Sequence, residues 1–196
     1  MRRRTFDRLV STEGLVLVPV LAVAGGMLSW ARRYITGEIR DQLAAQKIYF
    51  PAVDSAEIAA PEFDAVRQYA GQQLTNGDQA KAYADHFIAV HLSEMPYKGV
   101  YSKVSAASMA NPTNTALKSQ VQTVFQGTTL RGLLLEAYAF WQMGQIALIG
   151  SIVSFVLAAV MLVMTGFGFW HLRRVDPAEE LMPAPRHVSP ATPAMA

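Results

Sequence analysis

"WQMGQIALIGSIVSFVLAAVMLVMTGFGFW" (residues 141–170) contains no Asp, Glu, Lys or Arg. As an α-helix, with a rise of about 1.5 Å per residue, it would place its two terminal Trp residues about 43 Å apart. That distance is close to the thickness of a bilayer with both headgroup layers. The stretch therefore predicts a transmembrane helix and decides the fold class.

A second apolar stretch, residues 14–30, lies near the N-terminus and is also free of charge. The basic start of the chain and the Ala22-x-Ala24 pattern fit a secretory signal peptide with its cleavage site. We favour an uncleaved first transmembrane helix, because about 17 apolar residues reach the lower limit for crossing hydrocarbon. A cleaved signal peptide stays open as the alternative.

Composition narrows the function classes further. The chain has 196 residues, of which 52% are hydrophobic and 16% charged, and this balance departs from that of soluble proteins. A net charge of +2 gives no basic surface for neutralising nucleic-acid phosphates, so no nucleic-acid partner is expected. The absence of Cys from the sequence excludes disulfides, a thiolate nucleophile and Cys-ligated metals.

Arginines beside the apolar stretches predict the orientation. Those at the two outer ends are Arg2, Arg3, Arg4, Arg8, Arg173 and Arg174. Because Lys and Arg are enriched on the cytoplasmic side, both termini are expected inside and the central segment outside. The arginines at the inner ends count against this orientation: Arg32, Arg33, Arg40 and Arg131. A central segment of about 100 residues, however, is translocated largely regardless of charge.

The ends of both stretches carry candidate interface anchors. Trp30 and Trp141 are expected in the outer headgroup layer and Trp170 in the inner one, where an amphipathic indole is most favourable. Arg173 and Arg174 would anchor the inner end of the second helix. Packing of these Trp residues in a protein core is the alternative.

The first half of the central segment shows helical spacing. Ile35, Ile39 and Leu43 recur at every fourth position, which predicts that the first helix continues beyond the membrane. Pro61 suits the first position of another helix, and Asp78 is the expected N-cap of a helix over residues 79–95.

The second half is also predicted to be helical. Residues 100–110 form a short helix, and Asn111 is expected to cap the next one, with Gly127 allowing a break. From Thr128 a helix is expected to run into the second transmembrane helix, and no period-two pattern of a β-strand competes. We therefore predict an all-α membrane protein: two transmembrane helices with an intervening extracytoplasmic helical bundle.

Five segments follow from this interpretation. They are a basic cytoplasmic N-terminus (1–13), transmembrane helix 1 (14–34), an extracytoplasmic helical domain (35–140), transmembrane helix 2 (141–172) and a disordered Pro-rich cytoplasmic tail (173–196).

Small residues recur on one face of each predicted transmembrane helix: Ala22 and Gly26 on the first, and Gly150, Ser154 and Ala158 on the second. Small side chains let helix backbones approach closely in lipid, so we expect these faces to pack the two helices together. The same faces would also suit a homodimer or a larger partner, and Ala- and Gly-rich composition alone produces such patterns.

His86 and His91 are the only residues whose neighbourhood hints at a metal or a base, since Asp85 and Glu94 lie nearby. Five residues of α-helix turn through about 500°, which leaves the two rings about 140° apart and argues against a shared metal. We expect His91 to be a hydrogen-bonded residue of a packing face; a pocket formed with Tyr83 is the alternative. No phosphate-binding loop or nucleophile motif is present in the sequence, so we expect no catalytic residue, cofactor or metal.

Four stretches carry a resemblance to a family: "LVPVLAVAGGMLSW", "AAQKIYFP", "YAGQQLTNGDQAKAYADHFIAVHL" and "AYAFWQMGQIALIGSIVSFV" with "GFWHLRR". In them the chain resembles an uncharacterised family of small two-pass membrane proteins from actinobacteria, which implies a bacterial plasma membrane. Some members carry a label of aromatic-ring-opening dioxygenase. An iron site of that kind needs two His and a carboxylate. His171 and His187 lie far along the chain from His86 and His91, so the residues do not support the dioxygenase label.

The functional expectation is a non-enzymatic membrane protein that presents a helical domain outside the membrane. Membrane lipid and either a second copy or another membrane protein are the expected partners, in a structural or interaction role within a membrane or envelope assembly. A ligand-sensing module that signals through a partner is the alternative, and an enzyme is the least favoured class.

Overall fold

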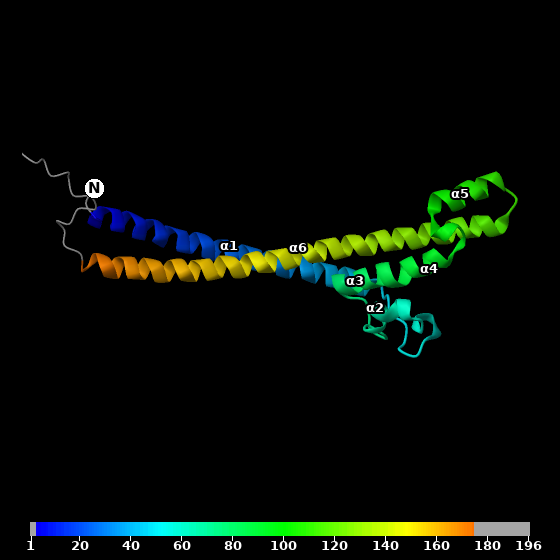
Figure 1. The fold of residues 1–196 in the computed structure, drawn as a ribbon, viewed down its shortest axis with the longest axis horizontal. Coiled ribbons are helices and arrows are strands. Elements are labelled where there is room, and N and C mark those ends of the chain that lie inside the picture. The colour runs from blue at the N-terminus through cyan, green and yellow to red at the C-terminus, as the bar shows by residue number, and fades with distance from the viewer. Residues whose placement is uncertain (1–2, 175–196) are drawn as a thin grey trace, which may run out of the picture. The chain divides into compact units, whose positions relative to one another are not determined.

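The computed structural model describes the backbone of residues 3–174 and the side chains of residues 8–174. Two long helices dominate it, α1 (Arg3–Ala45) and α6 (Thr115–Leu172) (Figure 1). The predicted all-α class is confirmed, since these residues form no β-strand beyond one isolated bridge between Tyr49 and Gln73. The predicted disordered tail lies outside the described residues.

Eight short helical elements connect α1 to α6. They are η1 (Ala56–Ile58), η2 (Pro61–Phe63), α2 (Asp64–Arg67), α3 (Gly77–Tyr83), η3 (Ala84–Ile88), α4 (Ala89–Glu94), η4 (Pro96–Gly99) and α5 (Tyr101–Ala110). Of these, η3 is a π-helical turn that joins α3 to α4. The chain divides into two compact units: unit 1 comprises Met1–Gly26 with Ser151–Ala196, and unit 2 comprises Met27–Gly150.

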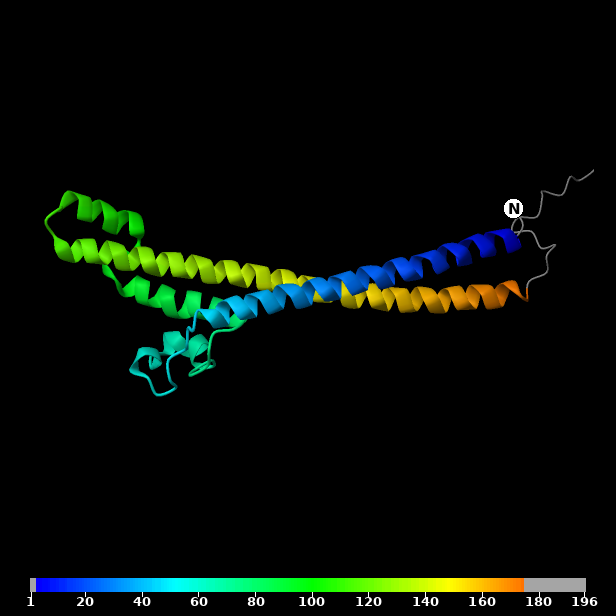
Figure 2. The same cartoon turned by 180° about the vertical axis from the view of Figure 1, so that it is seen from behind.

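Within unit 1, the first part of α1 and the last part of α6 run side by side and antiparallel (Figures 1 and 2). The residues where they meet are small: Ser11, Gly14, Gly25, Ser151, Ala158, Thr165 and Gly168. Ser151 Oγ donates a hydrogen bond to the Gly25 carbonyl at 2.9 Å. At Gly14 a Cβ would overlap the Thr165 side chain, so the two backbones approach as closely as small residues permit.

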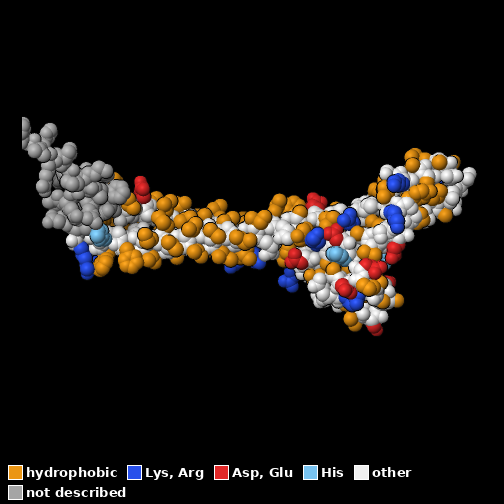
Figure 3. All heavy atoms as spheres, viewed as in Figure 1, with side chains coloured by type: hydrophobic (Ala, Val, Ile, Leu, Met, Phe, Trp, Pro, Cys, Tyr) orange, Lys and Arg blue, Asp and Glu red, His pale blue; other side chains and the backbone are white. Residues whose placement is uncertain are grey.

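The outward face of unit 1 is made of large apolar side chains. Val156, Leu162 and Phe167, for example, are all more than half exposed. Hydrophobic side chains accordingly cover the visible surface of this helix pair (Figure 3). Only 11% of the most apolar window of α1 and 17% of that of α6 are buried, so the described chain leaves most of both windows uncovered. Both helices are long and apolar enough to cross a membrane.

Unit 2 has an apolar core built around the end of α1 and Leu134 of α6. Its buried members are Ile39, Leu43, Phe50, Ile58, Phe63, Val66, Leu74, Ala80, Ala84, Ile88 and Leu134. Nearer the start of α6, α5 lies beside its first turns in both views (Figures 1 and 2), and one valine of each helix, Val104 and Val124, is fully buried. The predicted continuation of the first helix is thus observed, with Ile39 and Leu43 of its apolar stripe in the core.

Three local predictions need correction. The helix expected to begin after Asp78 is capped by Asn76, whose Oδ1 accepts from the Gln79 N–H at 2.9 Å. Likewise Asn114, rather than Asn111, caps α6 by accepting from the Leu117 N–H at 3.1 Å. Gly127 breaks nothing, because α6 is continuous there. A Cβ at Gly127 would lie 2.9 Å from Leu92 Cδ2, so close packing of α4 explains the glycine.

Candidate functional site

An aromatic cluster holds two of the predicted pocket residues, Tyr83 and His91. The Tyr83 and Phe87 ring centroids lie 4.7 Å apart, those of Phe87 and His91 4.5 Å, and those of Phe63 and His91 5.3 Å. Burial raises the pKa of Tyr83, with a smaller contribution from the charge of Glu57. Tyr83 is therefore a neutral, packed phenol at physiological pH.

His91 is stacked and hydrogen-bonded, and its side chain stays exposed. Its Nδ1 lies 2.8 Å from the Phe87 carbonyl oxygen, and because that oxygen can only accept, Nδ1 carries the hydrogen. His86 is exposed on η3. Since η3 is a π-helical turn, the regular α-helical angle assumed between the two His residues does not apply. Across residues 8–174, no three His, Asp or Glu side chains form a metal-binding group.

An ion-pair network ties η3 to α6. Asp85 accepts from Lys81 Nζ at 2.7 Å and from Arg131 Nη2 at 2.9 Å, one partner on each carboxylate oxygen. The hydrogen bond from Lys81, helped by that from Arg131, lowers the pKa of Asp85, while the carboxylate raises the pKa of Lys81. Every charge here has a partner, so we assign this network to the stability of unit 2.

The predicted interface anchors lie in different surroundings. Trp141 is half-buried: its side chain packs directly on Gly77, and its Nε1 donates to Asp78 Oδ2 at 3.3 Å. Trp30 is 67% exposed and stacks on Tyr34. In unit 1, Trp170 is exposed, with the Arg174 guanidinium 4.1 Å from its ring centroid, and Arg173 is exposed beside it.

Of the predicted packing residues, those on α6 lie at helix contacts and those on α1 do not. Ala158 is buried in unit 1, Ser154 is half-buried, and a Cβ on Gly150 would lie 3.1 Å from Leu28 within unit 2. Ala22 and Gly26 are exposed, contrary to the expectation that they pack against the second helix. The contact on α1 lies one residue before Gly26, because Gly25 packs against the Phe155 ring and its carbonyl accepts from the Ser151 hydroxyl.

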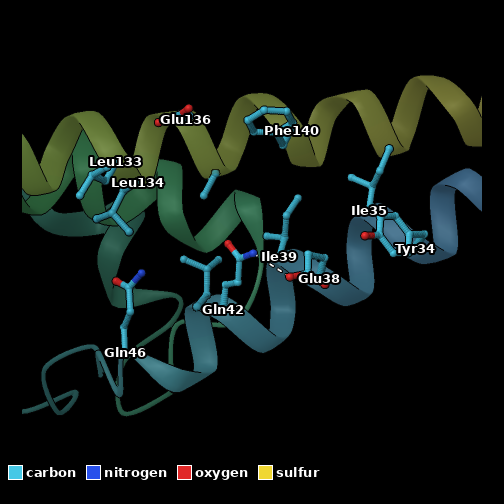
Figure 4. Close-up of a pocket in the computed structure, with 12 residues that line it drawn as sticks. Tyr34, Ile35, Glu38, Ile39, Gln42, Gln46, Leu133, Leu134, Glu136 and Phe140 are labelled. Atoms are coloured by element: carbon cyan, nitrogen blue, oxygen red, sulfur yellow. Dashed lines mark hydrogen bonds between the residues drawn. The ribbon is translucent and has the colours of Figure 1, made fainter.

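A groove lies between α1 and α6 in unit 2 (Figure 4). Its volume is about 540 Å³. The residues that line it are Tyr34, Ile35, Glu38, Ile39, Gln42, Leu43 and Gln46 from the α1 side, and Leu133, Leu134, Glu136, Ala137 and Phe140 from α6. We call this hollow the acidic groove, because Glu38 and Glu136 are its only charged residues.

The acidic groove combines two carboxylates, those of Glu38 and Glu136, and the Tyr34 phenol with an otherwise apolar and amide lining. Gln42 Nε2 donates to Glu38 Oε1 at 2.8 Å, which orients that carboxylate (Figure 4). Leu133 and Phe140 remain about half exposed, so the α6 wall that carries Glu136 also offers apolar surface. Such a lining favours an apolar ligand that carries positive charge.

Sequence reasoning did not predict the acidic groove. The stripe of Ile35, Ile39 and Leu43 marks the apolar face of α1, and Glu38 and Gln42 flank it. That pattern identifies only the α1 wall of the groove. The other wall comes from residues about 100 positions later, which the fold brings alongside.

No family model matches the chain, and no curated protein or solved structure matches it either. Any assignment of function therefore rests on the geometry of the chain itself. The resemblance to small two-pass actinobacterial membrane proteins stays a prediction.

Proposed function

We propose that the chain is a non-enzymatic integral membrane protein of a bacterial plasma membrane. The observation that carries the proposal is the surface of α1 and α6, whose apolar side chains are left uncovered by the described part of the chain. Burying apolar surface is worth about 25 cal/mol per Å², so a bilayer is the solvent that this surface favours.

We further propose that unit 2 is presented outside the cytoplasm and that both termini lie inside. Arg8, Arg173 and Arg174 stand at the outer ends of α1 and α6, where the positive-inside preference acts. Because the sequence contains no Cys, single cysteines report topology without interference. A cysteine at Val53, which is 72% exposed, should react with an impermeant maleimide in intact cells. One replacing Arg174 should react only after lysis, and the reverse pattern would refute this orientation.

The proposed role of unit 2 is to hold a membrane or envelope component at the acidic groove. The partner would dock an apolar segment bearing Lys or Arg in the groove that Glu38 and Glu136 line. The test is co-purification of the full chain in mild detergent after cross-linking in cells. Reversing both charges, Glu38→Lys with Glu136→Lys, should remove the cross-linked species.

Asp41→Lys is the matched control, because Asp41 is exposed on α1 and does not line the groove. It should leave the cross-linked species unchanged. A monomer with neither co-purifying protein nor lipid would refute the interaction role. Loss of the partner in both the double variant and Asp41→Lys would refute the groove as its site.

The volume of the acidic groove supports a second candidate function, a ligand-sensing module that signals through a partner. About 540 Å³ falls within the range of small-molecule sites. Amphipathic cations that raise the melting temperature of the wild-type chain, but not that of the Glu38→Lys, Glu136→Lys variant, would favour sensing over a structural role.

A further inference from the structure

A second hollow in unit 2 has the opposite charge. Its volume is about 460 Å³, and its lining residues are Arg32, Arg33, Thr36, Gly37, Arg40, Thr75, Asn76 and Trp141. We call it the arginine pocket, since three guanidinium groups and no carboxylate line it.

The arginines of this pocket have no ionic partner among the described side chains. Within residues 8–174, no Asp or Glu forms a salt bridge with Arg32, Arg33 or Arg40. The Nε of Arg32 is also buried without a hydrogen-bond partner. Arg67 and Arg131 each also have a buried Nε without a hydrogen-bond partner, but each pairs with a carboxylate through its Nη2. An unmet buried donor of a charged group is costly, so the described chain does not fully satisfy the Arg32 guanidinium.

The sequence position of the pocket points to the kind of anion that these arginines would meet. Arg32 and Arg33 directly follow the uncharged stretch 14–30, and Trp141 of the pocket wall begins the uncharged stretch 141–170. Trp30, one turn earlier on α1, is exposed and stacked on Tyr34, as suits an aromatic residue at the headgroup level. If the proposed membrane crossing holds, the arginine pocket lies in the layer of lipid phosphates.

We propose that the arginine pocket binds the phosphate of an anionic phospholipid headgroup. Guanidinium groups bind phosphate oxygens through paired, charge-assisted hydrogen bonds. The floor is open at Gly37, since a Cβ there would meet no atom within 4 Å. Asn76 uses its Oδ1 to cap α3, which leaves its amide NH₂ as a further donor at the rim. A lipid is favoured over a soluble phosphate because its acyl chains hold it beside the apolar part of α1.

The decisive variant fills the pocket without removing charge. Gly37→Leu places a side chain in the open floor, and leucine is a better helix former than glycine. Gly132→Leu is the matched control, since Gly132 is also helical and without neighbours within 4 Å, and it lines no pocket described above. A double variant, Arg33→Gln with Arg40→Gln, removes two of the charges and leaves the floor open.

The measurement is native mass spectrometry of the full chain released from nanodiscs of phosphatidylcholine with a minor fraction of phosphatidylglycerol. Wild type and Gly132→Leu should retain phosphatidylglycerol in preference to phosphatidylcholine. Gly37→Leu and the double arginine variant should lose about tenfold or more of that preference, as expected when a charged hydrogen bond is lost.

Equal retention by Gly37→Leu and Gly132→Leu would overturn the proposal, as would equal retention of both lipids by wild type. Displacement of phosphatidylglycerol by millimolar glycerol phosphate would assign the pocket to soluble phosphates instead of lipid. Resistance of the chain to alkaline extraction tests the membrane proposal separately. A chain that resists extraction and shows no lipid preference refutes the arginine pocket alone.

Discussion

Units 1 and 2 are built in opposite senses although α1 and α6 contribute to both. In unit 1 the buried residues are small or polar, such as Ser11, Ser151 and Thr165, and the large apolar side chains face outward. Unit 2 instead has a core in which large apolar residues such as Ile58, Leu74 and Leu134 are fully buried, and charged groups gather on its visible surface (Figure 3). This difference is what the proposed membrane crossing predicts, with lipid around unit 1 and water around unit 2.

Physical chemistry explains the inversion. Against water, burying apolar side chains drives association, so unit 2 places them inside. Lipid removes that drive, and helices then associate through close packing of small residues and hydrogen bonds between helices. The contacts of Ser151 with Gly25 and of Gly14 with Thr165 are of this second kind.

The largest effect is expected in the core of unit 2. Leu134 is 1% exposed, whereas its neighbour Leu133 is 57% exposed. Leu134→Ala should lower the free energy of unfolding by about 4 kcal/mol, because it removes buried methyl groups and leaves a cavity. Leu133→Ala should change it by less than about 0.5 kcal/mol. Thermal unfolding of the full chain in detergent, followed by circular dichroism, compares the two; equal destabilisation would mean that Leu134 is not in a water-excluded core.

Substitutions at two exposed valines test whether unit 1 faces lipid and unit 2 faces water. Val156 of unit 1 is 56% exposed and Val53 of unit 2 is 72% exposed. A lysine at Val156 should raise the apparent free energy of membrane insertion of the second helix by about 3 kcal/mol, because it lies at the centre of the apolar stretch. Val53→Lys should leave insertion and folding unchanged. A glycosylation reporter of insertion measures both, and tolerance of lysine at both positions would remove the contrast between the units.

These two tests concern properties that the sequence largely predicts. The helical class, both apolar helices and the core stripe of Ile39 and Leu43 follow from local spacing and hydropathy. The helix starts were less predictable, because Asn76 and Asp78 are both good caps and only the fold decides between them. The π-helical turn η3 likewise has no local sequence pattern.

Contacts between distant segments were beyond sequence reasoning. Small residues occur on several faces of α1, and the choice of Gly25 over Gly26 depends on Phe155 and Ser151 of α6. The two charged hollows have the same origin. Each joins a face of α1 to residues much later in the chain, so neither wall alone predicts a site.

The packing of unit 1 gives a third, smaller effect. Gly25→Leu should destabilise the helix pair by about 2 kcal/mol, because a Cβ there already lies 3.1 Å from the Phe155 ring and the larger side chain overpacks the contact. Gly26→Leu meets no atom within 4 Å and serves as the control. Unfolding of the full chain in mixed micelles compares them. The same loss at Gly26 would show that the outward face of α1 also packs, as the homodimer hypothesis requires.

The smallest effect lies in the ion pairs of unit 2 and depends on pH. Lys81 and Arg131 hold the pKa of Asp85 below its usual value, so the stabilisation is present above the unfolded pKa of about 3.9. It is lost as the pH falls through the folded pKa, when Asp85 takes up a proton. Because the two basic side chains are 46% and 41% exposed, solvent screening limits the contribution to about 1 kcal/mol or less.

Asp85→Asn should therefore lower stability at pH 7 and make unfolding less sensitive to acid below about pH 4. Asp64→Asn provides the control, since Asp64 also pairs with an arginine but is 74% exposed. It should change neither quantity measurably. If Asp85→Asn also changed neither, the network would be a surface pair like that of Asp64. In that case apolar packing alone would hold η3 against α6. The contrast between the units would then lie only in their buried side chains, which are large and apolar in unit 2 and small or polar in unit 1.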